Sequence, residues 1–160
     1  MRTETISIYK FDELSDAAKE TAREWGRQII GDDFAWSAES LDSIRQFCDE
    51  FGVSLKSWCV GQYEPVEFAT DADNGHFRGR KLSEFSRDAM PTGYCLDCAL
   101  WETFFDEFKR TGSAKSAFES AIYAGFTEWR DDMESQLEDE YIDDFLIANE
   151  FEFDEDGNRY

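Results

Sequence analysis

The spacing of apolar residues predicts four amphipathic helices and one short helix. In the four amphipathic helices, apolar side chains recur every three or four residues, so one stripe of each helix faces a core. Ser15 and Ser113 are suited to be N-caps, and Gly31, Gly52 and Gly112 to end helices. The predicted helices span residues 16–31, 37–51, 81–90, 94–110 and 113–141.

Alternation of apolar and polar residues predicts short strands before, between and after these helices. Asn74-Gly75 favours a tight turn, after which residues 76–78 return as a partner strand. A break in the last helix is expected near Asp139 or Asp143. The other predicted strands span residues 3–9, 53–60, 66–70 and 151–153. The predicted fold class is α+β, with a small antiparallel sheet of three to five strands packed against four to five helices and a long acidic C-terminal helical segment.

The chain has enough apolar residues to form a core. Of its 160 residues, 41% are hydrophobic and 16% are aromatic, which opposes disorder. This length suits one domain, and no repeat or low-complexity linker divides it. We therefore expect a single domain over residues 1–160.

Net charge narrows the partner classes. Thirty-seven Asp and Glu residues oppose 16 Lys and Arg residues, for a formal charge of −21. This balance opposes direct binding to nucleic acid and to anionic membranes. It favours basic partners, cations, or solubility alone. The opening residues lack the apolar stretch of a signal peptide and no apolar run is long enough to span a membrane, so a cytoplasmic location with reduced thiols is expected.

Cys95 and Cys98 have the CxxC spacing of metal and redox sites. Structural zinc needs four ligands, usually in two pairs, and Cys48, Cys59 and His76 are scattered. A thioredoxin-like motif needs a βαβ context, which the predicted elements lack. The favoured interpretation is a pair of thiols that pack in or near the core, with zinc and redox chemistry as the alternatives.

No catalytic, metal or cofactor site is predicted. His76 is the only histidine, and its place beside Asn74-Gly75 indicates an ordinary hairpin residue. The segments 71–75 and 154–158 begin like calcium loops but lack the acid at the twelfth position. Phosphate-binding loops, dinucleotide fingerprints and hydrolase motifs are absent from the sequence. An enzyme is therefore not expected.

The last third of the chain is the most acidic part. Residues 119–156 contain 15 Asp and Glu and one basic residue, Arg130. Carboxylates three or four residues apart on a helix repel one another, so such a row lowers stability. It either imitates the phosphates of nucleic acid or is a solvated face. The predicted partner-binding residues are Glu128, Asp131, Asp132, Glu134, Glu138, Asp139, Glu140, Asp143 and Asp144.

Two stretches, one near each end of the chain, have a distinctive sequence. The opening stretch is Tyr-Lys-Phe-Asp-Glu-Leu-Ser-Asp-Ala-Ala-Lys, residues 9–19, and the closing one is Ala-Asn-Glu-Phe-Glu-Phe-Asp-Glu-Asp-Gly, residues 148–157. Both resemble a family of small acidic phage and prophage proteins. The family is largely uncharacterised, so the resemblance implies context and no catalytic residues. At the level of class it is similar to anti-CRISPR and anti-restriction inhibitors, several of which block DNA-binding surfaces by imitating charge.

The leading hypothesis is an anti-CRISPR-like inhibitor of host defence, without enzymatic activity. Its acidic segment would occupy a basic nucleic-acid-binding groove of a host defence protein. The alternative is a phage accessory module that binds a host protein through apolar contacts, with charge serving solubility.

Overall fold

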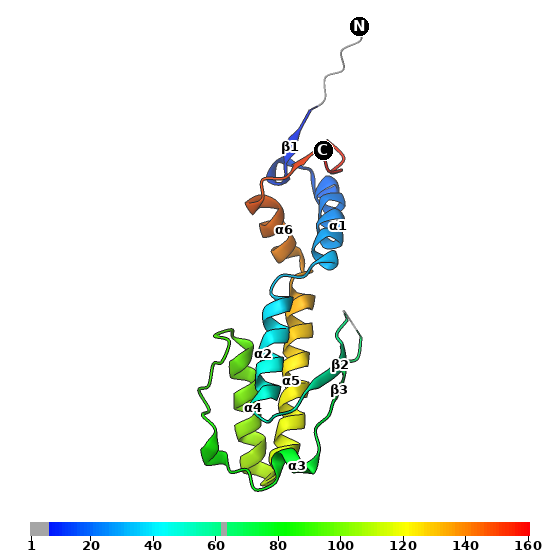
Figure 1. Cartoon of the computed structure of the whole chain (residues 1–160). Helices are drawn as coiled ribbons and strands as arrows, with labels where there is room; N and C mark the ends of the chain where they lie inside the picture. Colours follow the sequence, from blue (N-terminus) through cyan, green and yellow to red (C-terminus); the bar gives the residue numbers. More distant parts are fainter. Residues whose placement is uncertain (1–6, 62–63) are drawn as a thin grey trace. The chain divides into compact units, whose positions relative to one another are not determined.

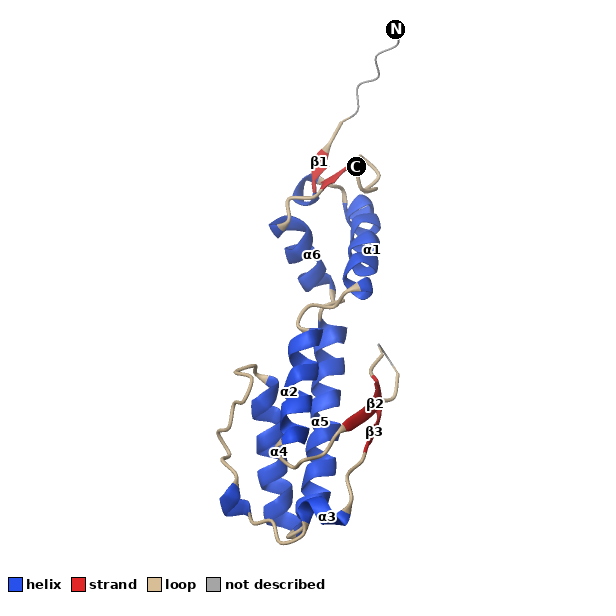
Figure 2. Ribbon diagram, in the orientation of Figure 1, coloured by secondary structure: helices blue, strands red, loops and turns tan. Residues whose placement is uncertain are grey.

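The computed structural model describes residues 7–61 and 64–160 and confirms the α+β class (Figure 1). The helices within these ranges are α1 (Asp16–Asp32), α2 (Ser37–Asp49), α3 (Asn74–Phe77), α4 (Leu96–Thr111), α5 (Ala114–Ser135) and α6 (Asp139–Ala148). The strands are β1 (Tyr9–Lys10), β2 (Leu55–Cys59), β3 (Glu67–Thr70) and β4 (Glu152–Phe153). Helices account for most of the ribbon, and the strands are short (Figure 2).

Internal contacts divide the chain into two compact units. The terminal unit comprises residues 1–35 and 133–160, and the central unit comprises residues 36–132. The single domain over residues 1–160 stays a prediction.

In the terminal unit, α1 and α6 lie side by side, with β1 and β4 paired next to them (Figure 1). The strands are antiparallel, with Tyr9 opposite Phe153. Gly26 of α1 allows the close approach, because a Cβ there would lie 2.9 Å from the Ile142 Cγ2 of α6. The buried core of this unit consists of Phe11, Leu14, Ala18, Ala22, Ile30, Ile142, Leu146 and Phe153.

The central unit has an aromatic core between α2, α4 and α5. The ring centroid of Phe47 lies 4.8 Å from that of Trp101 and 5.7 Å from that of Phe118. Strands β2 and β3 pair antiparallel, and Phe68 of β3 stacks on Phe126 of α5 with centroids 5.3 Å apart. Edge and stacked ring pairs of this kind add to the free energy gained by burying apolar surface.

The predicted helix ends are confirmed at three positions. The Ser15 hydroxyl accepts a hydrogen bond from the Ala18 N–H at the start of α1, 3.3 Å long. The Ser113 hydroxyl accepts one from the Ser116 N–H. Gly112 ends α4 with φ +70°, a conformation that glycine adopts without a side-chain clash.

The predicted sheet is wrong in its extent. In the described residues the four strands form two separate two-stranded sheets, which is fewer strands per sheet than expected. Of the strand predicted over residues 3–9, residues 3–6 lie outside the described residues, and β1 begins at Tyr9.

The predicted return strand at residues 76–78 is wrong, because Asn74 to Phe77 form helix α3. The Asp73 carboxylate accepts hydrogen bonds from the Gly75 and His76 N–H groups, so this segment begins a helix where a tight turn was expected. His76 is therefore a helical residue, not a hairpin residue.

The helix predicted over residues 81–90 shrinks to a single 3-10 turn, Leu82–Glu84. Phe85 then leaves the turn in extended conformation and stacks on Phe51, with centroids 5.0 Å apart. Phe85 thus packs against the aromatic core and does not continue the predicted helix.

Candidate binding surface on the acidic segment

The acidic segment forms two helices. The predicted break near Asp139 is confirmed, since α5 ends at Ser135 and α6 begins at Asp139. Glu138, in extended conformation, caps α6, and its carbonyl accepts a hydrogen bond from the Ile142 N–H. Acids at the start of a helix are favourable because they face the positive end of the helix dipole. Asp139 and Glu140 occupy this first turn.

The nine predicted partner-binding acids belong to both units. Glu128, Asp131 and Asp132 lie in the central unit. The remaining six, which lie in the terminal unit, are Glu134, Glu138, Asp139, Glu140, Asp143 and Asp144.

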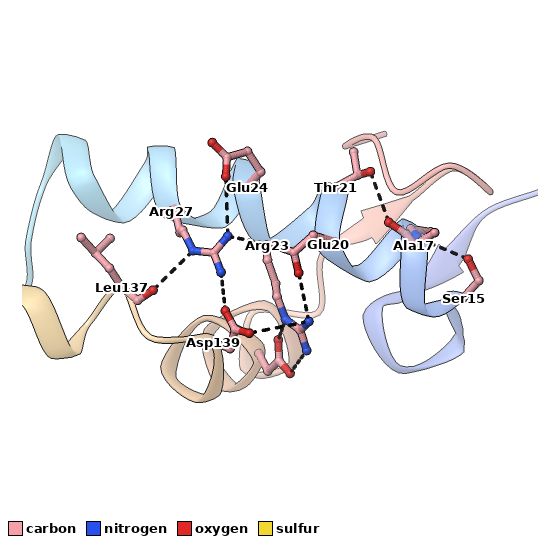
Figure 3. A network of polar contacts seen from close by, with 11 residues as sticks. Ser15, Ala17, Glu20, Thr21, Arg23, Glu24, Arg27, Leu137 and Asp139 are labelled. Atoms are coloured by element: carbon pink, nitrogen blue, oxygen red, sulfur yellow. Dashed lines mark hydrogen bonds and ion pairs between the residues drawn. The ribbon is translucent and has the colours of Figure 1, made fainter.

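Two acids of α6 bind the chain's own arginines (Figure 3). Arg23 of α1 donates from Nε and Nη2 to the two carboxylate oxygens of Asp143, each at 2.7 Å. Arg27, one turn along α1, forms an ion pair with Asp139 and donates to the Leu137 carbonyl oxygen at 3.4 Å. Such contacts neutralise part of the acidic helix.

The electrostatics of the arginines reflect this pairing. The hydrogen bond to Asp143 is the main cause that raises the pKa of Arg23. It outweighs burial, which lowers that pKa. Burial lowers the pKa of Arg27, but contacts with Glu20 and Asp139 outweigh it and the net shift is upward. Both arginine side chains therefore stay charged. The carboxylates of Asp139 and Asp143, which bind them, stabilise the packing of α6 on α1.

Three acids in α6 or at its N-cap remain available on the surface. Glu138, Glu140 and Asp144 are exposed, and within residues 7–61 and 64–160 none of them forms an ion pair. Tyr141 and Ile147, on the same helix, are 39% and 51% exposed. This "α6 face" (Glu138, Glu140, Tyr141, Asp144 and Ile147) combines unpaired carboxylates with apolar side chains.

A small cavity lies at the end of the α6 face. Its volume is about 180 Å³, and Ile147 belongs to both the cavity and the face. Lys10 closes one side, where its ammonium group donates to the Glu150 carbonyl oxygen at 2.7 Å. The lining residues are Lys10, Phe11, Asp12, Leu146, Ile147, Glu150 and Phe151. A lining that combines apolar side chains with the acids Asp12 and Glu150 suits a side chain that has an apolar stem and a positive end.

The acids of the central unit are less available as a group. Asp131 forms an ion pair with the neighbouring Arg130 at 2.7 Å. Asp132 is half-buried and lies close enough to Tyr94 to raise the pKa of that phenol, although burial is the main cause of the shift. Glu128 is exposed.

Charge is concentrated in the terminal unit. Its residues include 19 Asp and Glu and six Lys and Arg, a formal charge of −13. The larger central unit has 18 acids and ten bases, a formal charge of −8. The terminal unit therefore has the higher density of negative charge.

Two cysteines do not pack as expected. Cys95 and Cys98 are both exposed, so the interpretation that they pack in or near the core is wrong. Their places before and within the first turn of α4 leave Leu96 and Asp97 to face inward. Cys59 is also exposed, and none of the four thiols forms a disulfide. Burial raises the pKa of the Cys48 thiol to about 12.

In the two segments that begin like calcium loops, donors of the chain itself bind the Asp carboxylates. One oxygen of Asp154 accepts from the Asp156 and Asn158 N–H groups, at 3.0 and 2.9 Å. Asp71 binds Lys56 and the Ser54 N–H. Across residues 7–61 and 64–160, His, Cys, Asp and Glu side chains form no cluster of three suited to a metal ion.

Sequence reasoning missed two buried polar groups. The Gln136 amide accepts from the Ala35 N–H at 3.0 Å and donates to the Ala35 carbonyl at 3.2 Å. Asp97 is fully buried and accepts from the Thr92 N–H, the Thr92 hydroxyl and the Gly93 N–H. The helical pattern offered one signal, because Asp97 falls between Leu96 and Leu100 on the apolar side of α4.

Comparison with known proteins adds no relatives. No protein-family model, curated protein or solved structure matches the chain. The resemblance to small phage proteins therefore stays a prediction. No helix in the described ranges combines the length and apolar character that a bilayer crossing requires.

Proposed function

We propose that the protein binds a basic surface of a partner protein through the α6 face. The observation that carries the proposal is the placement of Glu138, Glu140 and Asp144, unpaired among the described residues, beside exposed Tyr141 and Ile147. Carboxylates bind Lys and Arg side chains by charge-assisted hydrogen bonds, and a nearby aromatic ring anchors such contacts.

The class of target follows from the same chemistry. A surface that binds phosphates carries clustered Lys and Arg, and a unit with a formal charge of −13 competes for it. Attraction between the opposite charges also speeds association. The proposed partner is a host defence protein with a basic nucleic-acid-binding groove, and the proposed effect is inhibition by occupation of that groove.

The set of binding residues is narrower than the nine acids suggested by the sequence. Asp139 and Asp143 bind Arg27 and Arg23, so reversing their charge would break contacts between α1 and α6 and confuse binding with folding. Glu138, Glu140 and Asp144 avoid this ambiguity.

The test compares two charge-reversed variants that carry the same change in net charge. One replaces Glu138, Glu140 and Asp144 by Lys, and the control replaces the exposed Glu64, Glu67 and Glu102 of the central unit by Lys. A partner is first recovered from host extract and purified. Its affinity for the wild type and both variants is then measured at several salt concentrations, with a DNA duplex as competitor.

The α6 variant should bind about ten-fold or more weakly, with a shallower salt dependence, and should compete less well with DNA. The control variant should lose less affinity, because its changes act only through long-range charge. Equal affinity of the α6 variant and the wild type would contradict the proposal, provided that circular dichroism shows both to be folded.

One observation favours the alternative, a module that binds through apolar contacts. Tyr141, Ile147 and the cavity beside them offer exposed apolar surface. On that hypothesis, replacing Tyr141 and Ile147 by Ser abolishes binding while the charge-reversed variants and added salt leave it unchanged. The two hypotheses thus differ in salt dependence.

A further inference from the structure

Two exposed thiols lie at the start of α4 in the central unit. Cys95 is the residue before the helix and Cys98 lies in its first turn. The Cys98 N–H donates to the Cys95 carbonyl oxygen at 3.0 Å. The side chains of both cysteines reach solvent, and Leu96 and Asp97 between them are buried. The turn therefore presents the two thiols together.

The Cα spacing of this turn suits a disulfide. Residues at the first and fourth positions of a hydrogen-bonded turn have Cα atoms less than about 7 Å apart. Disulfides join residues whose Cα atoms are about 4.4–6.8 Å apart. Side chains three positions apart on a helix are neighbours, so the sulfur atoms of Cys95 and Cys98 approach each other without a change of fold.

The surrounding contacts hold the turn in place. The buried Asp97 carboxylate accepts hydrogen bonds from Thr92 and Gly93, which fixes the loop that leads into α4. Burial is the main cause that raises the pKa of Tyr94, the residue before Cys95, so its hydroxyl keeps its proton. A thiolate is the form that attacks a disulfide.

We propose that Cys95 and Cys98 form a dithiol site that a low-molecular-weight disulfide of the glutathione type oxidises reversibly. The Cys95 thiolate attacks one sulfur of glutathione disulfide, forming a mixed disulfide and releasing one glutathione. The Cys98 thiolate then attacks the Cys95 sulfur and releases the second glutathione. Two electrons pass from the protein to glutathione, and the two thiol protons end on the two glutathione molecules.

The other two cysteines serve as internal controls. Cys59 is exposed but has no cysteine within three positions in sequence, so it stops at the mixed disulfide. Cys48 is buried and its pKa is raised to about 12, so it stays a neutral, unreactive thiol at pH 8. Each of the three environments thus predicts a different product.

The test treats the full chain with glutathione disulfide at pH 8, blocks free thiols with N-ethylmaleimide, and maps each cysteine by peptide mass spectrometry. The peptide with Cys95 and Cys98 should lose two hydrogens, Cys59 should carry glutathione, and Cys48 should carry the blocking group added after unfolding. In Cys98→Ser, glutathione on Cys95 should rise about ten-fold over the wild type, because no second thiol releases it. The Cys95→Ser variant checks Cys98 in the same way.

Two results would overturn the proposal. One is a wild-type protein in which Cys95 and Cys98 carry glutathione separately, to the same extent as Cys59. The other is an oxidised product in which Cys95 or Cys98 joins two chains, seen as a dimer on a non-reducing gel. Neither result depends on the partner proposed for the α6 face.

Discussion

Arg23 donates two parallel hydrogen bonds to Asp143, from Nε to Oδ1 and from Nη2 to Oδ2, and both are 2.7 Å long. The two residues are 120 positions apart, so this pair joins the first helix to the last. Their side chains are 20% and 28% exposed. A bidentate, partly buried pair of this kind is stronger than an exposed one. Part of the acidity of α6 therefore stabilises the terminal unit.

The Arg23–Asp143 pair should show a measurable coupling in a double-mutant cycle. The variants are Arg23→Gln, Asp143→Asn and the two together, with stability measured by urea unfolding. We expect a coupling energy of about 1–3 kcal/mol, because hydrogen bonds between charged groups lie in this range.

The matched control is Arg45 and Asp42, an exposed pair with 3.9 Å between nitrogen and oxygen. Its coupling should stay below about 0.5 kcal/mol. Equal coupling energies in the two cycles would show that the bidentate geometry makes the Arg23–Asp143 pair no stronger than a surface ion pair.

Gly157 should not tolerate a side chain. A Cβ at this position would lie 2.0 Å from the Ala18 carbonyl oxygen, and its φ is +87°. Gly157→Ala should therefore destabilise the protein by about 2–4 kcal/mol, since it combines backbone strain with a clash against a helix backbone.

A substitution at Gly79 tests backbone strain without a clash. Its φ is +76°, but no atom lies within 4 Å of an added Cβ. Gly79→Ala should cost about 1 kcal/mol from backbone strain alone. Thermal or urea unfolding of both variants measures the difference, and equal losses would show that the terminal loop moves away from α1 at little cost.

Local signals in the sequence predicted much of the helical structure. Ser15 and Gly112 mark helix ends because their effects depend on residues within four positions. The tight turn predicted at Asn74-Gly75 is wrong because the preceding Asp73 caps a helix. The choice between turn and helix depends on that one side chain. Pairing of β1 with β4 joins the two ends of the chain, which no local pattern indicates.

The candidate surface was only partly predictable. Charge density pointed to α6, and Glu138, Glu140 and Asp144 are the acids there that we propose as binding residues. No local pattern indicates that Asp139 and Asp143 bind arginines from a distant helix, although Arg23 and Arg27, four residues apart, share one face of α1. Exposure of Cys95 and Cys98 depends on which side of α4 packs inward.

Asp97 should be essential for the loop before α4. Its carboxylate is fully buried and accepts three hydrogen bonds through one oxygen, Oδ2. Asp97→Ala removes an acceptor of three hydrogen bonds to a charged group, from Thr92 and Gly93, which should cost about 2–4 kcal/mol. Asp97→Asn keeps one carbonyl oxygen and should cost less. Urea unfolding gives both values, and equal losses would mean that the charge matters more than the acceptor.

Asp71 provides a test of pH dependence in the central unit. Its carboxylate binds the Lys56 ammonium at 2.8 Å and the Ser54 N–H at 2.7 Å. These contacts, that of Lys56 first, lower the pKa of Asp71 from 3.8 to about 2. Because the pKa is lower in the folded state, the stabilising contribution is present above pH 3.8 and is lost as pH falls toward 2.

An NMR titration of the Asp71 carboxyl carbon should therefore have its midpoint near pH 2. In Lys56→Gln the midpoint should rise toward 3.8 without reaching it, because the Ser54 N–H still favours the ionised form. High salt should also raise the wild-type midpoint, since the pair is exposed. A wild-type midpoint at 3.8 that neither change moves would show that Asp71 is solvated and that the β2–β3 hairpin is held by its backbone bonds and by Phe68 on Phe126.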